Sequence, residues 1–596
     1  MHGQQNSAYG TANKETRINV GFFVYDKSAC YTYQTTNIMV KKWFSFIGKE
    51  IRGLHEAAYL LAIFALLSQV LALFRDKLLA FTFGAGHSLD VYYAAFRIPD
   101  FLFASIGSIV SASILLPYFI ERFSKDKEEG RTFSDSIFTL FFTAMIVVSV
   151  VFYIIAPEIV PHIIPGFAHD PSLPDLIASM RIMLLSPFFL GLSNLFSSLT
   201  QMRHRFLVYA LSPLLYNLGI IIGTVFIYPI VGISGLAIGV AVGAFLHMVV
   251  QLPFLIHEKT VPRFSLKIDW KRMRSILFTA LPRTITLSAN EFAEFILVSF
   301  ASLLSVGSIS IFNFAWNLQS VPLSLIGVSY SSAVFPTLSR LIHEKNIKEF
   351  LEKMIAAARH IIFWSMPIAI LFIVLRAQIV RTVLGAGKFD WADTRLTAAM
   401  LALFVVSTIG QSLIVLFVRA FYAEGKTRRP LIINAISAGV IVLLGYIGVH
   451  FYYHAVTFRY FIEILFKVDG QAGTSVLMLA LAYSIGTILN AILHWWMFER
   501  SYPGFTKPVL QTLFHSFSAS VIMGYVAFQG LRLFAFFPQE KVWGLFMQGS
   551  CAGVLGLIVG VVVLYFLKNQ ELAEVWRTLH HKIWKAKVPP AEVEHM

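Results

Sequence analysis

Residues 57–86 read "AAYLLAIFALLSQVLALFRDKLLAFTFGAG", an apolar stretch that contains three consecutive charges. The part up to Phe74 carries no charge. Arg75, Asp76 and Lys77 follow it directly. An apolar helix of about 20 residues spans the ~30 Å hydrocarbon core of a bilayer, where an Arg, Lys or Asp costs roughly 2.5–3.5 kcal/mol. The charges mark either the end of a span or a protected functional site, and the apolar "LLAFTF" that follows favours the second interpretation.

Composition assigns the whole chain to a class. Of 596 residues, 57% are hydrophobic and only 14% are charged, which excludes a water-soluble protein of this length. The apolar runs are about twenty residues long, whereas the strands of a membrane barrel alternate in blocks of about ten. Two cysteines, Cys30 and Cys551, exclude a disulfide framework, and no zinc motif is present. We therefore expect an all-α polytopic membrane protein without a metal or other cofactor.

The length rule predicts about fourteen membrane spans. They lie near 57–83, 90–120, 132–156, 174–200, 206–228, 231–256, 276–304, 308–337, 354–376, 392–420, 429–453, 472–497, 508–531 and 544–567. Most lysines and arginines between them fall on the side that holds both termini, which the positive-inside rule makes cytoplasmic. The net charge of +15 therefore indicates orientation and contact with anionic membrane lipids rather than nucleic-acid binding.

Short repeats indicate an internal duplication. "SASILLPYF" at 111–119 is similar to "YSSAVFPTL" at 330–338, and "PLLYN" at 213–217 is similar to "PLIIN" at 430–434. The first residues of the two pairs are separated by nearly the same distance, 330 − 111 = 219 and 430 − 213 = 217. An even number of spans per copy gives two parallel copies, which usually form their site at the midplane between them.

These observations predict six regions along the chain. They are a cytoplasmic N-terminal segment at 1–56, an N-lobe of six helices at 57–256, a cytoplasmic linker at 257–275, a C-lobe of six helices at 276–497, two further spans at 498–568 and a basic amphipathic cytoplasmic tail at 569–596. Residues 1–38 are polar, and "MVKKWF" from Met39 resembles a natural cytoplasmic start. Met39 as the initiator and a disordered extension before it are both open interpretations.

Residues 68–100, "SQVLALFRDKLLAFTFGAGHSLDVYYAAFRIPD", resemble the span 1 to span 2 signature of the MurJ/MviN lipid II flippases. Further stretches similar to that family follow in order through span 11. They are "LLSPFFLGLSNLFSSLTQMRHRF" at 184–206, "SPLLYNLGIIIG" at 212–223, "GAFLHMVVQLP" at 243–253, "GVSYSSAVFPTLSR" at 327–340, "GAGKFDWADT" at 385–394 and "RAFYAEGKTRRPL" at 419–431. The resemblance implies the MOP flippase fold, in which two six-helix lobes enclose a central cavity and two C-terminal helices are added.

The resemblance also implies a function. Such a protein is not an enzyme. It carries lipid II, the undecaprenyl-pyrophosphate-linked peptidoglycan precursor, from the inner to the outer leaflet of the bacterial cytoplasmic membrane by alternating access. Guanidinium groups recognise phosphate through two parallel hydrogen bonds, so a cationic cavity suits this substrate.

The chain departs from the family pattern in this cavity. Gln69, Phe103 and Asn317 occupy positions where the family usually has arginines, while Arg75 matches and Arg97 stands at a normally basic position. The predicted substrate-binding residues are Arg75, Arg97, Arg283, Gln69, Asn317 and Ser68. The predicted gate or ion-coupling residues are Asp76, Asp90, Asp100, Glu291 and Glu294. We expect Arg75 to face the cavity and to pair with Glu294 in one state.

Two alternatives remain open. Glu291 and Glu294 make the cavity less attractive to an anion, which favours a flippase for another polyprenyl-linked glycan or a cation-coupled exporter of the same superfamily. The missing arginines also fit a non-transporting scaffold, whose partners would be cell-wall synthesis enzymes. A cavity closed by Phe103 would support the scaffold, and an open cavity lined by Arg75, Arg97 and Arg283 would argue against it.

Overall fold

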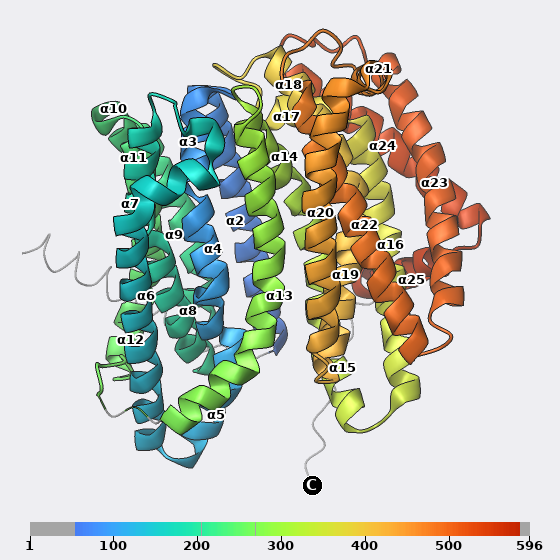
Figure 1. Ribbon diagram of the computed structural model, residues 1–596. Coiled ribbons are helices and arrows are strands. Elements are labelled where there is room, and N and C mark those ends of the chain that lie inside the picture. The colour runs from blue at the N-terminus through green and yellow to red at the C-terminus, as the bar shows by residue number, and fades with distance from the viewer. Residues whose placement is uncertain (1–53, 204, 267, 269, 585–596) are drawn as a thin grey trace, which may run out of the picture. The chain divides into compact units, whose positions relative to one another are not determined.

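The computed structural model describes residues 54–584 except 204, 267 and 269 (Figure 1). These residues belong to one compact unit, Glu50–Met596. The predictions about Met39 and residues 1–38 lie outside the described residues, as does the end of the tail. All regular structure in the described part of the chain is helical, so the predicted fold class is confirmed.

The first half of the chain, up to residue 257, forms helices of unequal length. They are α2 (Leu54–Phe83), α3 (His87–Ala95), α4 (Arg97–Ser105), η1 (Gly107–Val110), α5 (Ala112–Lys125), α6 (Lys127–Ile163), η2 (Pro165–Phe167), α7 (Leu173–Met183), α8 (Leu185–Met202), α9 (Phe206–Ile222), η3 (Gly223–Ile227), α10 (Tyr228–Val231), α11 (Ser234–Val249) and α12 (Leu252–His257). The charges at 75–77 lie inside α2, which continues to Phe83. The prediction that this helix does not end at Phe74 is confirmed.

The second half repeats this order of elements. It contains α13 (Trp270–Ser302), α14 (Ser308–Pro322), η4 (Leu323–Val328), α15 (Ser329–His343), α16 (Ile347–Val374), α17 (Arg376–Val383), α18 (Trp391–Val406), α19 (Thr408–Ala423), α20 (Arg428–His454), α21 (Val456–Phe466), η5 (Thr474–Val476) and α22 (Leu477–Ser501). The last helices are α23 (Thr506–Leu533), α24 (Val542–Phe566) and α25 (Gln570–Trp584). Helix α21 was not expected from the sequence.

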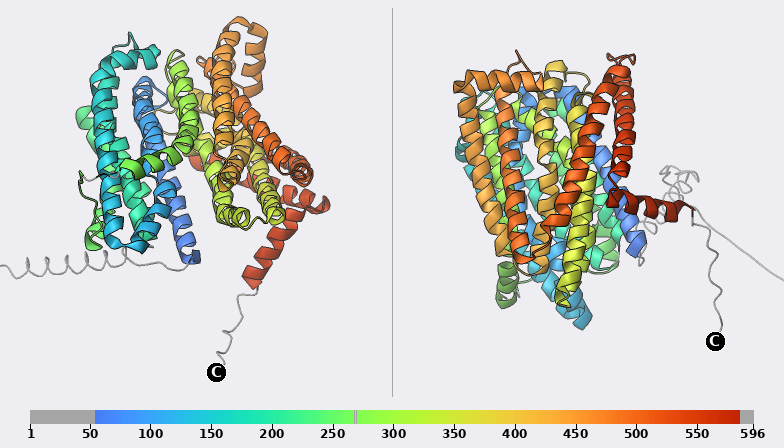
Figure 2. Two further views of the ribbon diagram at one scale, coloured as in Figure 1. Left: turned by 60° about the horizontal axis from the view of Figure 1, so that its bottom comes forward. Right: turned by 90° about the vertical axis from the view of Figure 1, so that its right-hand side faces the viewer.

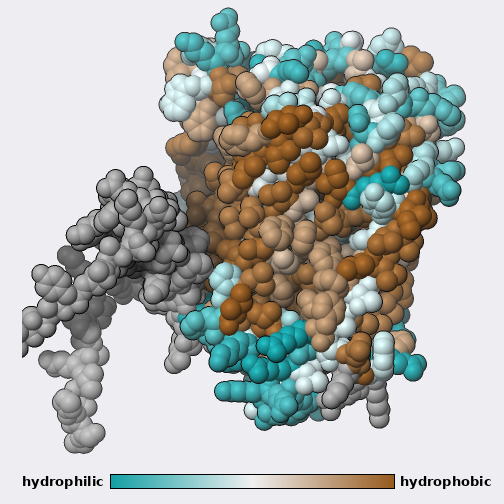
Figure 3. All heavy atoms as spheres, turned by 90° about the vertical axis from the view of Figure 1, so that its left-hand side faces the viewer, coloured by the Kyte–Doolittle hydropathy of each residue, from teal (hydrophilic) through white to brown (hydrophobic). Residues whose placement is uncertain are grey.

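Length and composition identify the membrane helices. Ten helices of the described residues are long and apolar enough to cross a membrane, and the bent pair α18–α19 adds an eleventh. Three further runs occupy the ranges of predicted spans 1, 2 and 7. They are α2, α3–α5 and α13, which contain charged residues or breaks. Together these runs account for the fourteen predicted spans, and one face of the molecule carries a hydrophobic band between two hydrophilic rims (Figure 3).

The two halves lie on opposite sides of the view in Figure 1, with α13 between them. Helix α13 contacts α4 of the first half and α20 of the second. The break between α3 and α4 lies next to this contact. Pro99, in the first turn of α4, cannot donate a backbone hydrogen bond to the preceding turn, so the span is interrupted there. This break places Arg97 and Asp100 in the first turn of a new helix.

Candidate functional site: a charged pocket between the two halves

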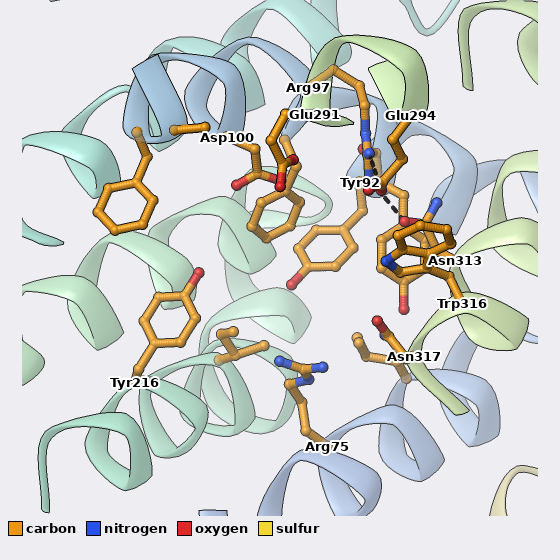
Figure 4. Close-up of a pocket in the computed structure, with 16 residues that line it drawn as sticks. Arg75, Tyr92, Arg97, Asp100, Tyr216, Glu291, Glu294, Asn313, Trp316 and Asn317 are labelled. Atoms are coloured by element: carbon orange, nitrogen blue, oxygen red, sulfur yellow. Dashed lines mark hydrogen bonds and ion pairs between the residues drawn. The ribbon is translucent and has the colours of Figure 1, made fainter. Parts of the chain in front are cut away.

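A pocket of about 340 Å³ lies where the two halves meet (Figure 4). Its walls come from α2, α3, α4 and α9 of the first half and from α13 and α14 of the second. It is lined by Arg75, Leu79, Tyr92, Tyr93, Phe96, Arg97, Asp100, Phe103, Ala104, Tyr216, Ile220, Glu291, Glu294, Asn313, Trp316 and Asn317. The predicted residues Arg75, Arg97, Asp100, Glu291, Glu294 and Asn317 therefore surround one cavity.

Arg75 enters the pocket from α2 and is held within its own half. Its Nε and Nη2 donate to Asp76 Oδ1 at 3.0 and 2.8 Å, and its Nη1 donates to Asn217 Oδ1 at 2.9 Å. The side chain of Arg75 keeps 18% exposure, against 5% for Asp76. The prediction that Arg75 faces the cavity is confirmed, and its carboxylate partner is Asp76 rather than Glu294.

Asp76 also reaches the second half. Its Oδ2 accepts a hydrogen bond from Asn317 Nδ2 of α14 at 3.1 Å. One carboxylate therefore neutralises Arg75 and links α2 to α14. Asp76 therefore faces the neighbouring helix α14.

Arg97 is held across the interface between the halves. Its Nη1 donates to Glu294 Oε1 at 2.7 Å and its Nη2 to Asn313 Oδ1 at 2.8 Å, while Nε donates to the Tyr93 carbonyl at 3.3 Å. The exposed fractions of the Arg97 and Glu294 side chains are 7% and 11%. A buried charge requires such a partner, because an unpaired one would lose its hydration without compensation. In this structure Glu294 pairs with Arg97 and not with Arg75, because Arg97 lies on the helix that packs against α13; a pair of Arg75 with Glu294 in another state stays a prediction.

The pocket contains more carboxylates than guanidinium groups. Asp100 and Glu291 point into the same part of the cavity, and the carboxylate of neither makes a hydrogen bond to another described residue (Figure 4). With Glu294, they give three carboxylates against two arginines among the described residues of the lining. Phe103 lines one wall and leaves the pocket open.

The predicted residues Ser68 and Gln69 do not line this pocket. Ser68 and Gln69 precede Arg75 on α2, and Ser68 Oγ accepts a long hydrogen bond of 3.5 Å from Asn217 Nδ2. Arg283 lies in α13, and its side chain is outside the described residues.

Asp90 joins the two halves at the end of α2. Its Oδ2 accepts from the Gly307 N–H at 2.6 Å, and its Oδ1 accepts from the Ser310 N–H at 2.8 Å and from Ser310 Oγ at 2.6 Å. These donors belong to the N-terminus of α14, where a carboxylate is favoured by the unpaired N–H groups and the helix dipole. Asp90 therefore connects α3 of the first half to the start of α14 in the second half.

Glycines let the two halves approach closely at this end. Gly307 has φ +89°, and a Cβ there would lie 2.2 Å from the carbonyl oxygen of Ala85. Gly387 has φ +58°, and a Cβ there would lie 2.3 Å from the carbonyl oxygen of Phe81. Only glycine combines a positive φ with such an approach at low cost. Many of the hydrogen bonds between the halves gather here, including Lys77 Nζ to the Thr382 carbonyl at 2.9 Å.

Sequence analysis missed several residues of the site. Asn217 and Asn313 accept hydrogen bonds from the two arginines. The Tyr93 hydroxyl is buried in the pocket wall without a hydrogen-bond partner in the described residues. In the sequence, Asn217 stands out only as the last residue of the repeated "PLLYN". An amide in a membrane helix more often packs against another helix than binds a substrate. No signal in the sequence distinguished Tyr93 from its neighbours. In the described residues no group of three or more metal-ligating side chains occurs.

Comparison with known proteins decides the family. The family model described as "Lipid II flippase MurJ" matches residues 79–549. The chain belongs to the lipid II flippase MurJ family. A curated relative, the probable lipid II flippase MurJ of Thermotoga maritima, is 26% identical over 534 residues, which cover 86% of this chain and 97% of the relative. Members of the MurJ family match across nearly all predicted spans, so the resemblance of residues 68–100 is confirmed.

Solved structures agree on the fold. A MurJ structure described as an inward closed conformation matches with a TM-score of 0.67 at 23% identity, over 86% of this chain and all of that chain. An inward-facing MATE family transporter of the MOP superfamily matches with a TM-score of 0.60 at 14% identity, over 74% of this chain and 96% of that chain. At these identities the likeness is one of fold. The chain is a multi-pass membrane protein with the MOP flippase fold.

Proposed function

We propose that this protein moves lipid II, or a closely related polyprenyl-pyrophosphate glycan, across the bacterial cytoplasmic membrane by alternating access of its two halves. The observation that carries the proposal is the pocket between the halves of a MurJ family chain, in which Arg75 and Arg97 are held at the interface. The pyrophosphate is the group that cannot cross hydrocarbon unaided. Two guanidinium groups supply the planar, always charged donors that phosphate oxygens accept.

Both arginines keep donors for a ligand. A guanidinium group has five N–H donors, and each arginine uses three in hydrogen bonds among the described residues. Arg75 and Arg97, together with Arg283 and Asn317, are the proposed substrate-binding residues. Ser68 and Gln69 are also proposed to bind the substrate; Ser68, seven residues before Arg75, shares its helix face, whereas Gln69 points about 120° away from it.

We assign gate roles to the carboxylates that connect the halves. Asp76, Asp90 and Glu294 each bond a residue of the opposite half, so these bonds must break when the halves separate on that side. Asp100 and Glu291 are the proposed ion-coupling residues, because a bound cation or proton would offset their negative charge. In this scheme the pyrophosphate replaces Glu294 as the partner of Arg97.

The proposal includes an orientation. The excess of lysine and arginine on the side of the termini supports a cytoplasmic location for both ends. The predicted tail 569–596 begins with α25, where Arg359 Nε of α16 bonds Glu571. The end of α2 and the start of α14 then face the outer leaflet. Reporter fusions after residues 125 and 170 test this, with cytoplasmic signal expected only from the first.

A second candidate is a cation-coupled exporter of the same superfamily. The observation that favours it is the excess of carboxylates, Asp100, Glu291 and Glu294, over arginines in the pocket. Glu291→Gln separates the candidates in proteoliposomes. An exporter of organic cations loses substrate binding with this variant, whereas a lipid flippase keeps lipid binding and changes only its dependence on pH or sodium.

The decisive experiment measures lipid II exposure on the outer leaflet of bacteria depleted of their own flippase. The protein, its Arg75→Ala form and its Arg181→Ala form are expressed, and membrane insertion is verified for each. Arg181 is the matched control because it bonds the Tyr153 carbonyl at 2.9 Å, away from the pocket. Exposure restored by the protein and by Arg181→Ala, and lost with Arg75→Ala, supports the proposal.

A binding measurement on the purified protein does not depend on the bacterial host. Purified protein is titrated with lipid II and with undecaprenyl phosphate, which lacks the second phosphate and the sugars. Tighter binding of lipid II that requires Arg75 supports the proposal. Binding of neither lipid by a folded protein overturns it and leaves the exporter or the cell-envelope scaffold, whose partners would be cell-wall synthesis enzymes.

A further inference from the structure

Helix α21 is an amphipathic helix at the end of the molecule opposite α25 (Figure 1). It begins at Val456, separated by one residue from the end of the membrane helix α20 at His454. In the right-hand view of Figure 2 it lies across the ends of the upright helices. The pocket and the proposed transport do not involve it.

The helix buries its only carboxylate. Glu463 is 2% exposed, and its Oε1 accepts hydrogen bonds of 2.9 Å each from Tyr452 Oη, Arg459 Nε and Thr474 Oγ1. Arg395 of α18 also donates to the carbonyl of Lys467, just after α21. These bonds fix which side of α21 faces the protein.

The opposite side of α21 is an exposed apolar stripe. It consists of Val456, Tyr460, Phe461, Ile464 and Leu465, which are 58%, 58%, 60%, 66% and 54% exposed. At about 100° per residue these side chains cover about half of the helix circumference, and the exposed Thr457 lies among them. A helix at a water-covered surface shows the reverse pattern, with charges outward and apolar residues inward. A contiguous exposed apolar face of this kind indicates a surface that meets an apolar environment.

The position of the stripe identifies its partner. It continues from α20, which exposes Tyr446, Ile447 and Phe451 along a membrane span, and the rings of Phe451 and Phe458 lie 5.2 Å apart. Tyrosines and a flanking cation such as Lys467 are typical of the membrane–water interface. The exposed apolar residues of the span therefore lead onto α21, with the exposed polar residues His450, His454 and Thr457 among them, as is typical of the headgroup region.

We propose that α21 is an interfacial lipid-binding helix. Its apolar stripe lies in the headgroup and upper acyl region of the leaflet at this end, while the Glu463 network ties its other side to α20 and η5. The partner is phospholipid, not a second protein. By this contact the membrane surface holds the end of the second half at a defined depth.

The experiment uses spin labels on the full chain. Cys30 and Cys551 are replaced by serine, and single cysteines are placed at Ile464 and, as a control, at Asp469, whose side chain is 68% exposed beyond the helix. The labelled protein is reconstituted into phosphatidylcholine–phosphatidylglycerol vesicles. Collision rates with oxygen, which concentrates in lipid, and with a nickel chelate, which stays in water, are compared.

The label at Ile464 is expected to collide severalfold more with oxygen than with the chelate, and the label at Asp469 the reverse. Equal access of the chelate at both sites overturns the proposal, because the stripe then faces water. Protection of Ile464 from both reagents also overturns it, because a protein partner or a second copy then covers the stripe. Phe461→Glu, which leaves the Glu463 network intact, is expected to abolish the oxygen preference at Ile464.

Discussion

The two arginines of the pocket are held in different ways. Arg75 is neutralised by Asp76, its neighbour on the same helix, whereas Arg97 is neutralised by Glu294 from the opposite half. Separation of the halves leaves the first ion pair intact and breaks the second. Arg75 therefore offers a permanent, partly neutralised anchor, and Arg97 becomes available to an anion only in a state in which the halves have moved apart.

The pair between Arg97 and Glu294 couples the charge of the pocket to the separation of the two halves. In a medium of low dielectric constant, Arg97 cannot lose Glu294 unless another anion or water replaces it. A pyrophosphate is such an anion, so substrate binding and separation of the halves at α13 favour each other. In the proposed mechanism, Glu294 pairs with Arg97 again after the lipid leaves, which restores the closed state.

The largest expected effect follows from breaking the pair between the halves. Arg97→Ala leaves Glu294 buried without a partner and is expected to destabilise the protein by about 3–5 kcal/mol. Replacing both residues, Arg97→Met with Glu294→Leu, is expected to recover most of this loss because apolar side chains of similar size need no partner. Thermal unfolding of the purified protein in detergent measures both. A double variant no more stable than Arg97→Ala would contradict the proposed role of the pair.

Substitution of Arg75 tests whether this arginine binds the phosphate groups of lipid II. Arg75→Lys keeps the charge and removes the bidentate geometry, so lipid II binding is expected to weaken by about 1.5–3 kcal/mol, the contribution of hydrogen bonds to a charged group. Stability is expected to change little because Asp76 keeps a cationic partner. Titration with lipid II measures the binding, and Arg181→Lys is the control. Unchanged binding by Arg75→Lys would contradict the proposed role of the Arg75 guanidinium group and would leave Arg97 and Arg283 as the candidate phosphate-binding arginines.

Gly307→Ala acts on the contact between the halves without touching either arginine. The added Cβ would collide with the Ala85 carbonyl, and the positive φ adds strain of about 1–3 kcal/mol. The protein is expected to shift toward a state with the halves separated at this end, which exposes the buried Leu89. Labelling of a Leu89→Cys variant by an impermeant maleimide measures this.

Gly439→Ala is the matched control for that variant. A Cβ at Gly439 meets nothing within 4 Å, so labelling is expected to stay at the level of the unmodified background. An equal increase in labelling with both substitutions would mean that the effect is not specific to the contact at Gly307.

The smallest effect concerns an ion pair within the second half, far from the interface. Burial alone would raise the pKa of Glu463, but hydrogen bonds from Arg459, Thr474 and Tyr452 lower it below its usual value. The stabilisation is therefore complete above the usual glutamate pKa of about 4.3 and is lost as the pH falls through the lower folded value. The mobility of a spin label at Ile464 is expected to rise on that acid side.

Glu463→Gln is expected to remove this pH dependence. The amide oxygen still accepts from Tyr452 and Thr474, so the cost at neutral pH is expected to stay within about 1 kcal/mol. Gate opening measured at Leu89→Cys should not change, because this pair does not connect the halves. A change there would mean that α21 is coupled to the pocket.

The membrane class, the fourteen spans and the presence of Arg75 in the pocket were predictable from the sequence. Hydrocarbon imposes a length and an apolar composition on every span, and a charge inside such a span must face a protected site. The stretch at residues 68–100, together with the similar stretches that follow it in order through span 11, was also enough to recognise the family. Each of these conclusions depends on local sequence alone.

The partners of the charges were decided only by tertiary structure. Arg75 bonds Asp76 and Asn217, and Arg97 bonds Glu294 and Asn313. These partners are set by which helix faces pack together. The exposed stripe of α21 could not be predicted from the sequence for the same reason. The sequence does not show that the Glu463 side of the helix packs against the protein. Helix periodicity states which residues share a face, and only the packing of distant helices states what that face meets.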